Sequence, residues 1–130
     1  MSIATFLAAP RFAVVGASVD RSKFGNRVLR YYLAHGKPVV PVNPKEATVE
    51  GVPAVAALTA IPATDASDTS VSIITPPAVT RRVLDDAVAH GFVRFWLQPG
   101  AEFPGWQEYA AEKKVAIIAG GPCVLVDAKL

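Results

Sequence analysis

The sequence has few of the residues that form covalent cross-links and metal sites. It contains 1 Cys and 2 His among 130 residues. A single thiol excludes an internal disulfide and a multi-cysteine metal site, and it suits a reducing compartment. We therefore expect no resident metal ion.

Long apolar runs and an excess of one charge are also lacking. The 13 Lys and Arg oppose 11 Asp and Glu, which leaves a net charge of +2. So small and scattered a charge does not indicate a nucleic-acid or membrane partner. No apolar run reaches the ~18 residues of a membrane-spanning helix, and residues 1–7 lack the charged start of a signal peptide. We expect a cytoplasmic protein.

What the sequence does contain is a set of short apolar segments separated by helical ones. Hydrophobic residues make up 52% of the chain, with 9 Gly and 11 Pro, which is typical of one compact globular domain over residues 1–130. The pattern predicts strands at 12–15, 38–42, 71–75, 93–97 and 115–119, helices at 23–35, 78–90 and 105–114, an edge strand within 49–55 and a polar loop at 65–70. This alternation predicts a Rossmann-like, doubly wound α/β fold, with a mostly parallel sheet and helices on both faces.

The end of the first predicted strand has the character of a phosphate-binding turn. Gly16, Ala17 and Ser18 follow the apolar run and precede a helix. Small residues let backbone N–H groups approach an anion, and the start of a helix adds unpaired donors and a positive dipole end. The turn alone is also compatible with an ordinary strand-to-helix connection.

The other strand ends are rich in small residues and proline. Ligands of open parallel sheets lie beyond the carboxyl ends of the strands, where the winding reverses. Catalytic sites usually present carboxylates, histidines or metal ligands there. These ends instead predict a docking face for a large ligand, with no catalytic residue. The four ends are Asn43-Pro44-Lys45, Thr75-Pro76-Pro77, Gln98-Pro99-Gly100 and Gly120-Gly121-Pro122-Cys123.

The strand-end motifs together resemble those of stand-alone CoA-binding domain proteins. They occur in register over nearly the whole chain, as Val15-Gly16-Ala17-Ser18 with Lys23-Phe24-Gly25, Pro41-Val42-Asn43-Pro44, Thr75-Pro76-Pro77 and Trp96-Leu97-Gln98-Pro99-Gly100. The chain is similar to the small single-domain CoA-binding proteins and, more distantly, to the N-terminal domain of the succinyl-CoA synthetase α subunit. One departure is Ala119-Gly120-Gly121-Pro122-Cys123, where the small proteins tend to carry an acidic and a basic residue before the cysteine.

This resemblance implies a ligand, coenzyme A or an acyl-CoA, and a set of contacts. Gly16, Ala17 and Ser18 would contact phosphates or ribose, with Lys23 and Gly25 in the same loop. The remaining implied contacts are Val42, Asn43, Pro44 and Lys45 along the nucleotide and Thr75, Pro76 and Pro77 at the other lip. The implied role is that of a non-catalytic, accessory or regulatory module. The synthetase forms its phosphohistidine on a second domain, so its ligase chemistry is not implied here.

Two other functions are compatible with this fold. A small oxidoreductase or redox sensor would bind NAD or NADP, but it should carry spaced glycines and an acidic residue after the second strand, where this chain has Asn43. A neutral amide near Lys45 suits a phosphorylated ribose better than a free diol. The other alternative is a regulatory interaction protein with a vestigial nucleotide pocket.

Several further side chains receive structural interpretations. His35 and His90 each precede a glycine at a predicted helix end, which favours a capping role over catalysis. Phe103 and Trp106 are expected to pack the last helix, although an exposed aromatic pair there would allow a homodimer. Cys123 is either a small buried hydrophobe or a thiol near the pantetheine arm.

The turn also suggests a test of the site. Gly16→Val should abolish ligand binding with the fold retained, because the new side chain would occupy the approach of the phosphate.

Overall fold

The fold is built on a five-stranded sheet in which every pair of neighbours is parallel. The computed structural model describes residues 1–130. The strands follow the order β2-β1-β5-β6-β7. Their bounds are β1 Arg11–Val15, β2 Val39–Val42, β5 Thr69–Ile73, β6 Arg94–Leu97 and β7 Ala116–Ile118. The predicted Rossmann-like, doubly wound class is confirmed.

The predicted edge strand takes a different form. Thr48–Val49 (β3) and Val52–Pro53 (β4) pair with each other as a small antiparallel hairpin outside the main sheet. Val55 then forms a single parallel bridge to Val42. Its N–H donates to the Pro41 carbonyl at 3.0 Å, and its own carbonyl accepts from the Asn43 N–H at 2.9 Å. One residue therefore occupies the third-strand position of the 3-2-1-4-5-6 order.

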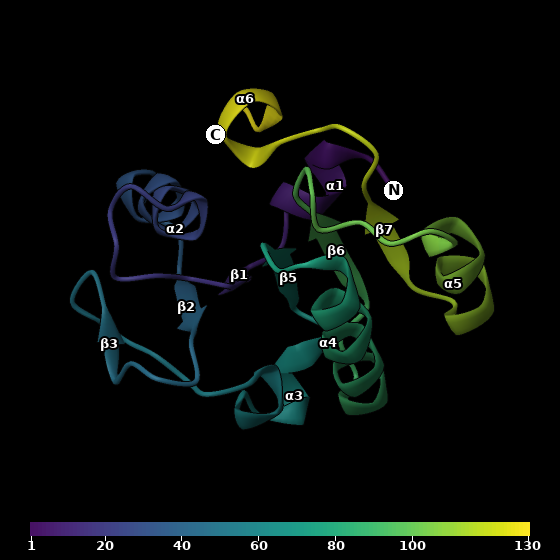
Figure 1. Cartoon of the computed structure of the whole chain (residues 1–130), viewed down its shortest axis with the longest axis horizontal. Coiled ribbons are helices and arrows are strands. Elements are labelled where there is room, and N and C mark those ends of the chain that lie inside the picture. Colours follow the sequence, from purple (N-terminus) through teal and green to yellow (C-terminus); the bar gives the residue numbers. More distant parts are fainter.

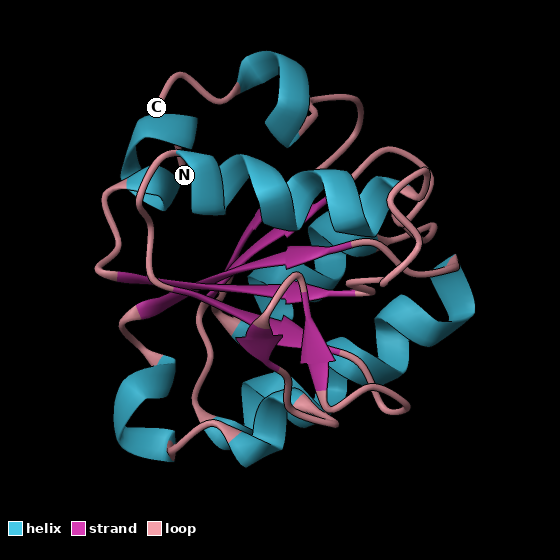
Figure 2. Cartoon of the chain, turned by 90° about the vertical axis from the view of Figure 1, so that its left-hand side faces the viewer, coloured by secondary structure: helices cyan, strands magenta, loops and turns pink.

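Helices cover both faces of the sheet (Figure 2). One face carries α1 (Ile3–Leu7), α2 (Phe24–Ala34) and α6 (Val124–Asp127), which enclose the core around Phe6, Phe12, Tyr32 and Trp96. The other carries a 3₁₀ turn η1 (Leu58–Ala60), α3 (Ala63–Ala66), α4 (Pro77–His90) and α5 (Trp106–Lys113), whose core includes Val71, Leu84 and Phe95. Strands buried on both sides explain the continuous apolar runs of the sequence.

Two segments were predicted wrongly or missed. The expected polar loop at 65–70 contains the end of α3 and the start of β5. In β5, Ser70 and Ser72 are fully buried, and both hydroxyl groups have partners: Ser70 Oγ donates to the Phe6 carbonyl at 2.7 Å and Ser72 Oγ lies 2.8 Å from Tyr32 Oη. Polar residues with such partners do not signal exposure. Helix α6 was not predicted at all.

The predictions that His35 and His90 lie at helix ends and that Phe103 packs against the last helix are confirmed. His90 is the last residue of α4, its Nε2 lies 2.7 Å from the Ile61 carbonyl, and Gly91 follows in the left-handed conformation at φ +112°. His35 Nδ1 lies 2.8 Å from the Tyr31 carbonyl. Phe103 is buried and packs edge-on against Tyr109 at 5.6 Å, so no exposed aromatic pair supports a homodimer there.

The helices of this fold are short. None has the combination of length and apolar character needed to cross a membrane.

Candidate functional site

A cavity opens where the winding of the sheet reverses. Strand β1 has β2 on one side and β5 on the other, so the connections after β1 and β5 leave the sheet toward opposite faces (Figure 1). The cavity at their carboxyl ends has a volume of about 350 Å³. This is the position at which open α/β sheets bind ligands.

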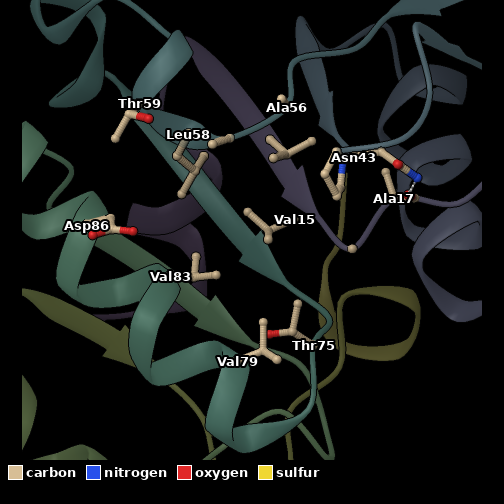
Figure 3. A pocket seen from close by; sticks show the side chains of 14 residues that line it. Val15, Ala17, Asn43, Ala56, Leu58, Thr59, Thr75, Val79, Val83 and Asp86 are labelled. Atoms are coloured by element: carbon tan, nitrogen blue, oxygen red, sulfur yellow. Dashed lines mark hydrogen bonds between the residues drawn. The ribbon is translucent and has the colours of Figure 1, made fainter.

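The lining of the cavity is mostly apolar. Val15 lies at its centre, Leu58 lies on one side, and Val79 and Val83 of α4 lie on another (Figure 3). Val42, the last residue of β2, also lines it. The other lining residues are Gly16, Ala17, Asn43, Pro44, Ala56, Ala57, Thr59, Thr75 and Asp86. Asp86 is the one titratable side chain among them. A flat, largely apolar group with a few polar atoms at its edge suits such a space.

The turn after β1 depends on two glycines that touch each other. Gly16 has φ +92°, and a Cβ at this position would lie 2.0 Å from the Ile74 carbonyl oxygen. Gly25, in the first turn of α2, approaches so closely that its Cβ would lie 1.9 Å from the Gly16 oxygen. Gly25 therefore serves the close helix packing that the third glycine serves in the dinucleotide fingerprint, although its spacing differs. The expectation that Gly16→Val retains the fold was wrong, because the added side chain would collide with backbone.

The carbonyl groups of this turn all face the protein. Besides the Gly16 carbonyl against Gly25, the Ala17 carbonyl accepts from Asn43 Nδ2 and the Ser18 carbonyl accepts from Asn26 Nδ2, both at 2.8 Å. The N–H groups of residues 16–19 have no acceptor within the chain. A trans peptide directs its N–H opposite to its carbonyl. The turn thus presents unused donors away from the body of the protein, as an anion site requires.

The loop between the turn and α2 is held by its own side chains. Ser18 Oγ accepts from the Asp20 N–H at 3.1 Å, and Asp20 Oδ1 accepts from the Ser22 hydroxyl at 2.7 Å and the Ser22 N–H at 2.9 Å. Both hydrogen bonds from Ser22 lower the pKa of the Asp20 carboxyl, and the bond from the hydroxyl has the larger effect. Asp20 is therefore ionised at neutral pH, and its role is to shape the loop.

Half of the twelve predicted contact residues line the cavity. These are Gly16, Ala17, Val42, Asn43, Pro44 and Thr75. Ser18, Lys23 and Gly25 belong to the adjoining turn and the start of α2, whereas Lys45 and Pro77 are exposed beside the opening. Pro76 lines a neighbouring hollow with Pro99 and Gly100.

Sequence reasoning missed the wall formed by residues 56–59 and the side formed by α4. The segment Ala56-Ala57-Leu58-Thr59 has no distinctive motif, and only the bridge at Val55 brings it beside β2. Val79 and Val83 did carry a signal, because they belong to the apolar stripe of α4. That stripe is half-buried at its start and forms part of the cavity there.

Some basic side chains near the turn already have partners within the chain, and others do not. Arg30 Nε donates to Asn26 Oδ1 at 2.7 Å, and Arg21 Nε lies 3.5 Å from Glu50. Lys23 and Arg27 form no side-chain hydrogen bond or ion pair within the chain. Of the four basic residues in this region, these two are the ones left free to meet an anion.

A family model and several solved structures match this chain. The family model described as "CoA binding domain" matches residues 10–129. A search of curated proteins found no match. A conserved hypothetical protein from Pyrococcus furiosus is 32% identical, with a TM-score of 0.82, and the match covers 91% of this chain and 98% of that one.

Two further solved structures resemble it. A protein from Thermus thermophilus is 28% identical, with a TM-score of 0.82 and coverage of 97% of this chain and 96% of that chain. The dinucleotide forming acetyl-coenzyme A synthetase 1 of Ca. Korarchaeum cryptofilum is 24% identical, with a TM-score of 0.72, over 85% of this chain and 25% of that one. The likeness to the synthetase is one of fold.

Proposed function

The chain belongs to the CoA binding domain family, and on that premise we propose that it binds coenzyme A or an acyl-CoA as a non-catalytic, accessory or regulatory module. The ligand lies across the carboxyl ends of β1 and β5. The adenine ring occupies the apolar cavity, and the diphosphate lies over the turn at residues 16–18.

The observation that carries this proposal is the adjacency of two complementary surfaces. An apolar cavity of about 350 Å³ borders a turn whose N–H groups have no internal acceptor. Coenzyme A needs both, because its adenine is flat and largely apolar while its diphosphate needs many donors. Asp86 can accept a hydrogen bond from the adenine amino group. Lys23, Arg27 and Lys45 supply positive charge for the phosphates.

The polar composition of the cavity supports a binding role without chemistry. Asp86 is the single titratable side chain in the lining, and Asn43 already uses its amide oxygen and one amide hydrogen within the protein. General acid–base or nucleophilic catalysis needs a second group within hydrogen-bond reach. The proposed role is therefore to hold the ligand, with its acyl end directed away from the cavity.

Calorimetric titration with CoA tests the proposal. We expect saturable binding, and in a thermal-shift comparison a larger rise in melting temperature with CoA than with NAD or NADP, because a ligand stabilises the state that it binds. No heat with CoA at several millimolar, from folded protein, would overturn it. A larger shift with NAD or NADP would favour the nicotinamide alternative.

A cavity-filling substitution tests the location of the site. Val79 is half-buried and lines the cavity, so Val79→Trp should fill the adenine position and weaken CoA binding at least about tenfold while the fold is kept. Ala89→Trp, on an exposed part of the same helix, is the matched control and should bind as wild type does. Equal affinities for both variants would place the ligand elsewhere.

A further inference from the structure

Two asparagine side chains hold the proposed phosphate turn from outside it. Asn26 lies on α2 and is fully buried, and Asn43 follows β2. They reach the carbonyl groups of two consecutive residues, Ser18 and Ala17, each at 2.8 Å. Neither contact belongs to a helix or strand ladder.

The hydrogen-bond partners fix which amide atom faces the turn. Arg30 Nε can only donate, so the Asn26 atom 2.7 Å from it is Oδ1, and Nδ2 faces Ser18. The backbone N–H groups of Lys45 and Glu46 lie 2.8 and 3.2 Å from the Asn43 oxygen, so its Nδ2 faces Ala17. Neither amide can be turned over without losing these bonds.

Holding the carbonyls determines where the following N–H groups point. The peptide plane is rigid, so fixing the Ala17 carbonyl toward Asn43 directs the Ser18 N–H away from β2. Fixing the Ser18 carbonyl toward Asn26 likewise directs the Val19 N–H away from α2. Without these two bonds both peptides could rotate and turn carbonyl oxygens toward the ligand.

The two anchors also tie the turn to the segment of residues 45–50, which follows β2 and precedes the cavity wall at 56–59. Asn26 Nδ2 donates a second bond to Glu50, at the tip of the β3–β4 hairpin, at 3.1 Å. Asn43 fixes the start of that same segment through its bonds from Lys45 and Glu46. The segment is thus attached to the turn at both of its ends.

We infer that Asn43 and Asn26 are positioning residues, which orient the turn at residues 17–19 so that its N–H groups receive the ligand's phosphates. The inference rests on the proposed function, but it assigns to Asn43 a different role from the direct nucleotide contact that the family resemblance implies.

Two substitutions at Asn43 separate positioning from charge. Asn43→Asp keeps the oxygen that accepts from Lys45 and Glu46 but cannot donate to Ala17. Asn43→Ser replaces the amide by a hydroxyl too short to reach the Ala17 carbonyl, without adding charge. Both should weaken CoA binding about tenfold. Glu46→Ala removes an exposed side chain and leaves the backbone bond intact, so it is the control and should bind as wild type. Normal binding by Asn43→Ser would overturn the inference, because charge repulsion alone would then explain Asn43→Asp.

Adenosine, titrated by NMR, separates positioning from direct contact. It fills the cavity and carries no phosphate, so its affinity should stay within about twofold in both variants. An equal loss for adenosine and CoA would make Asn43 a direct contact of the nucleoside and overturn the inference.

A measurement without ligand keeps the test independent of the proposed function. The backbone ¹⁵N order parameters of Ala17, Ser18 and Val19 should fall from a rigid value of about 0.85 toward about 0.6 in both Asn43 variants, while those of α2 stay unchanged. Unchanged values in the turn would overturn the inference even if CoA bound. If wild type bound no CoA, the proposed function would fail and this result would still decide the role of Asn43.

Discussion

At the scale of single residues, the turn after β1 is specified by steric limits more than by chemistry. Gly16 and Gly25 leave no room for a Cβ, since each would press it against a backbone carbonyl oxygen at about 2 Å. The sequence pattern correctly indicated that this turn needs small residues. It could not distinguish space needed by a ligand from space needed by the protein, because both require glycine.

Replacement of Gly16 should therefore affect folding before binding. We expect Gly16→Ala to lower the free energy of unfolding by at least about 3 kcal/mol, measured by urea denaturation. Gly100→Ala is the matched control, because Gly100 has a similar φ of +95° but nothing within 4 Å of its Cβ position. It should lose only about 1–2 kcal/mol from backbone strain. Similar losses of free energy of unfolding in Gly16→Ala and Gly100→Ala would contradict the claim that a Cβ at residue 16 collides with the backbone.

Ser22 should control the acidity of Asp20. The Ser22 hydroxyl bond is the largest cause of the lowered Asp20 pKa, so Ser22→Ala should raise that pKa toward the usual value of 3.8. The N–H bond should keep it from reaching that value. Because the folded-state pKa is the lower one, the contribution of Asp20 to stability is present above pH 3.8 and is lost as the pH falls through the folded-state pKa. NMR titration of the carboxyl carbon measures the change, and an unaltered pKa would refute this cause.

At the scale of elements, the long helices and central strands were predictable and the short connections were not. α2, α4 and α5 have apolar stripes and clear stops, and their predicted ranges lie within two residues of those in the structure. The predicted strand at 71–75 began two residues after the start of β5, because Ser70 was assigned to a polar loop. Ser70 and Ser72 alternate with apolar residues, as in a half-exposed segment. Their partners, Phe6 and Tyr32, lie far away in the sequence, and a local pattern carries no information about such partners.

The bond between Ser72 and Tyr32 should join β5 to α2 energetically. Both residues are fully buried and their oxygens lie 2.8 Å apart. Tyr32→Phe should cost about 1–3 kcal/mol because it leaves the serine hydroxyl without its partner. In a double-mutant cycle with Ser72→Ala, measured by urea denaturation, the double mutant should lose about 1 kcal/mol less free energy of unfolding than the sum of the two single mutants' losses. Additive losses would mean that the contact contributes nothing of its own.

At the scale of the whole molecule, stability should decline at high pH. Burial raises the pKa of Tyr32 well above the usual value of 10, and burial together with the hydrogen bond to Asp85 does the same for Tyr109. A raised folded-state pKa means that these tyrosines ionise first in the unfolded chain, so their contribution is full below pH 10 and is lost as the pH rises above it.

The measurement is the free energy of unfolding between pH 8 and 11. For Tyr32 the loss should reach about 1.4 kcal/mol for each pH unit above 10. Tyr32→Phe should be less stable at pH 8 but should lose less on going to pH 11. An equally steep decline in this variant would assign the alkaline sensitivity to other groups.

The lining of the candidate site was predictable only where it consists of residues at strand ends. A doubly wound sheet places those ends along one edge, so residues 16–17, 42–44 and 75 could be grouped without coordinates. The wall at residues 56–59 depends on one backbone pairing at Val55, and the orientation of the turn depends on Asn26. Both arise from tertiary contacts, which no local motif in the sequence reveals.

The pairing at Val55 also bears on how copies of this sheet could associate. On the outer side of β2, Pro41 has no N–H, its carbonyl is already used by Val55, and the Asn43 N–H is used as well. The carboxyl-terminal half of that border is therefore closed to a recruited strand, as in sheets that resist edge-to-edge aggregation. At the opposite border, β7 pairs with β6 alone. A second copy that lengthened the sheet would therefore meet fewer obstacles at β7.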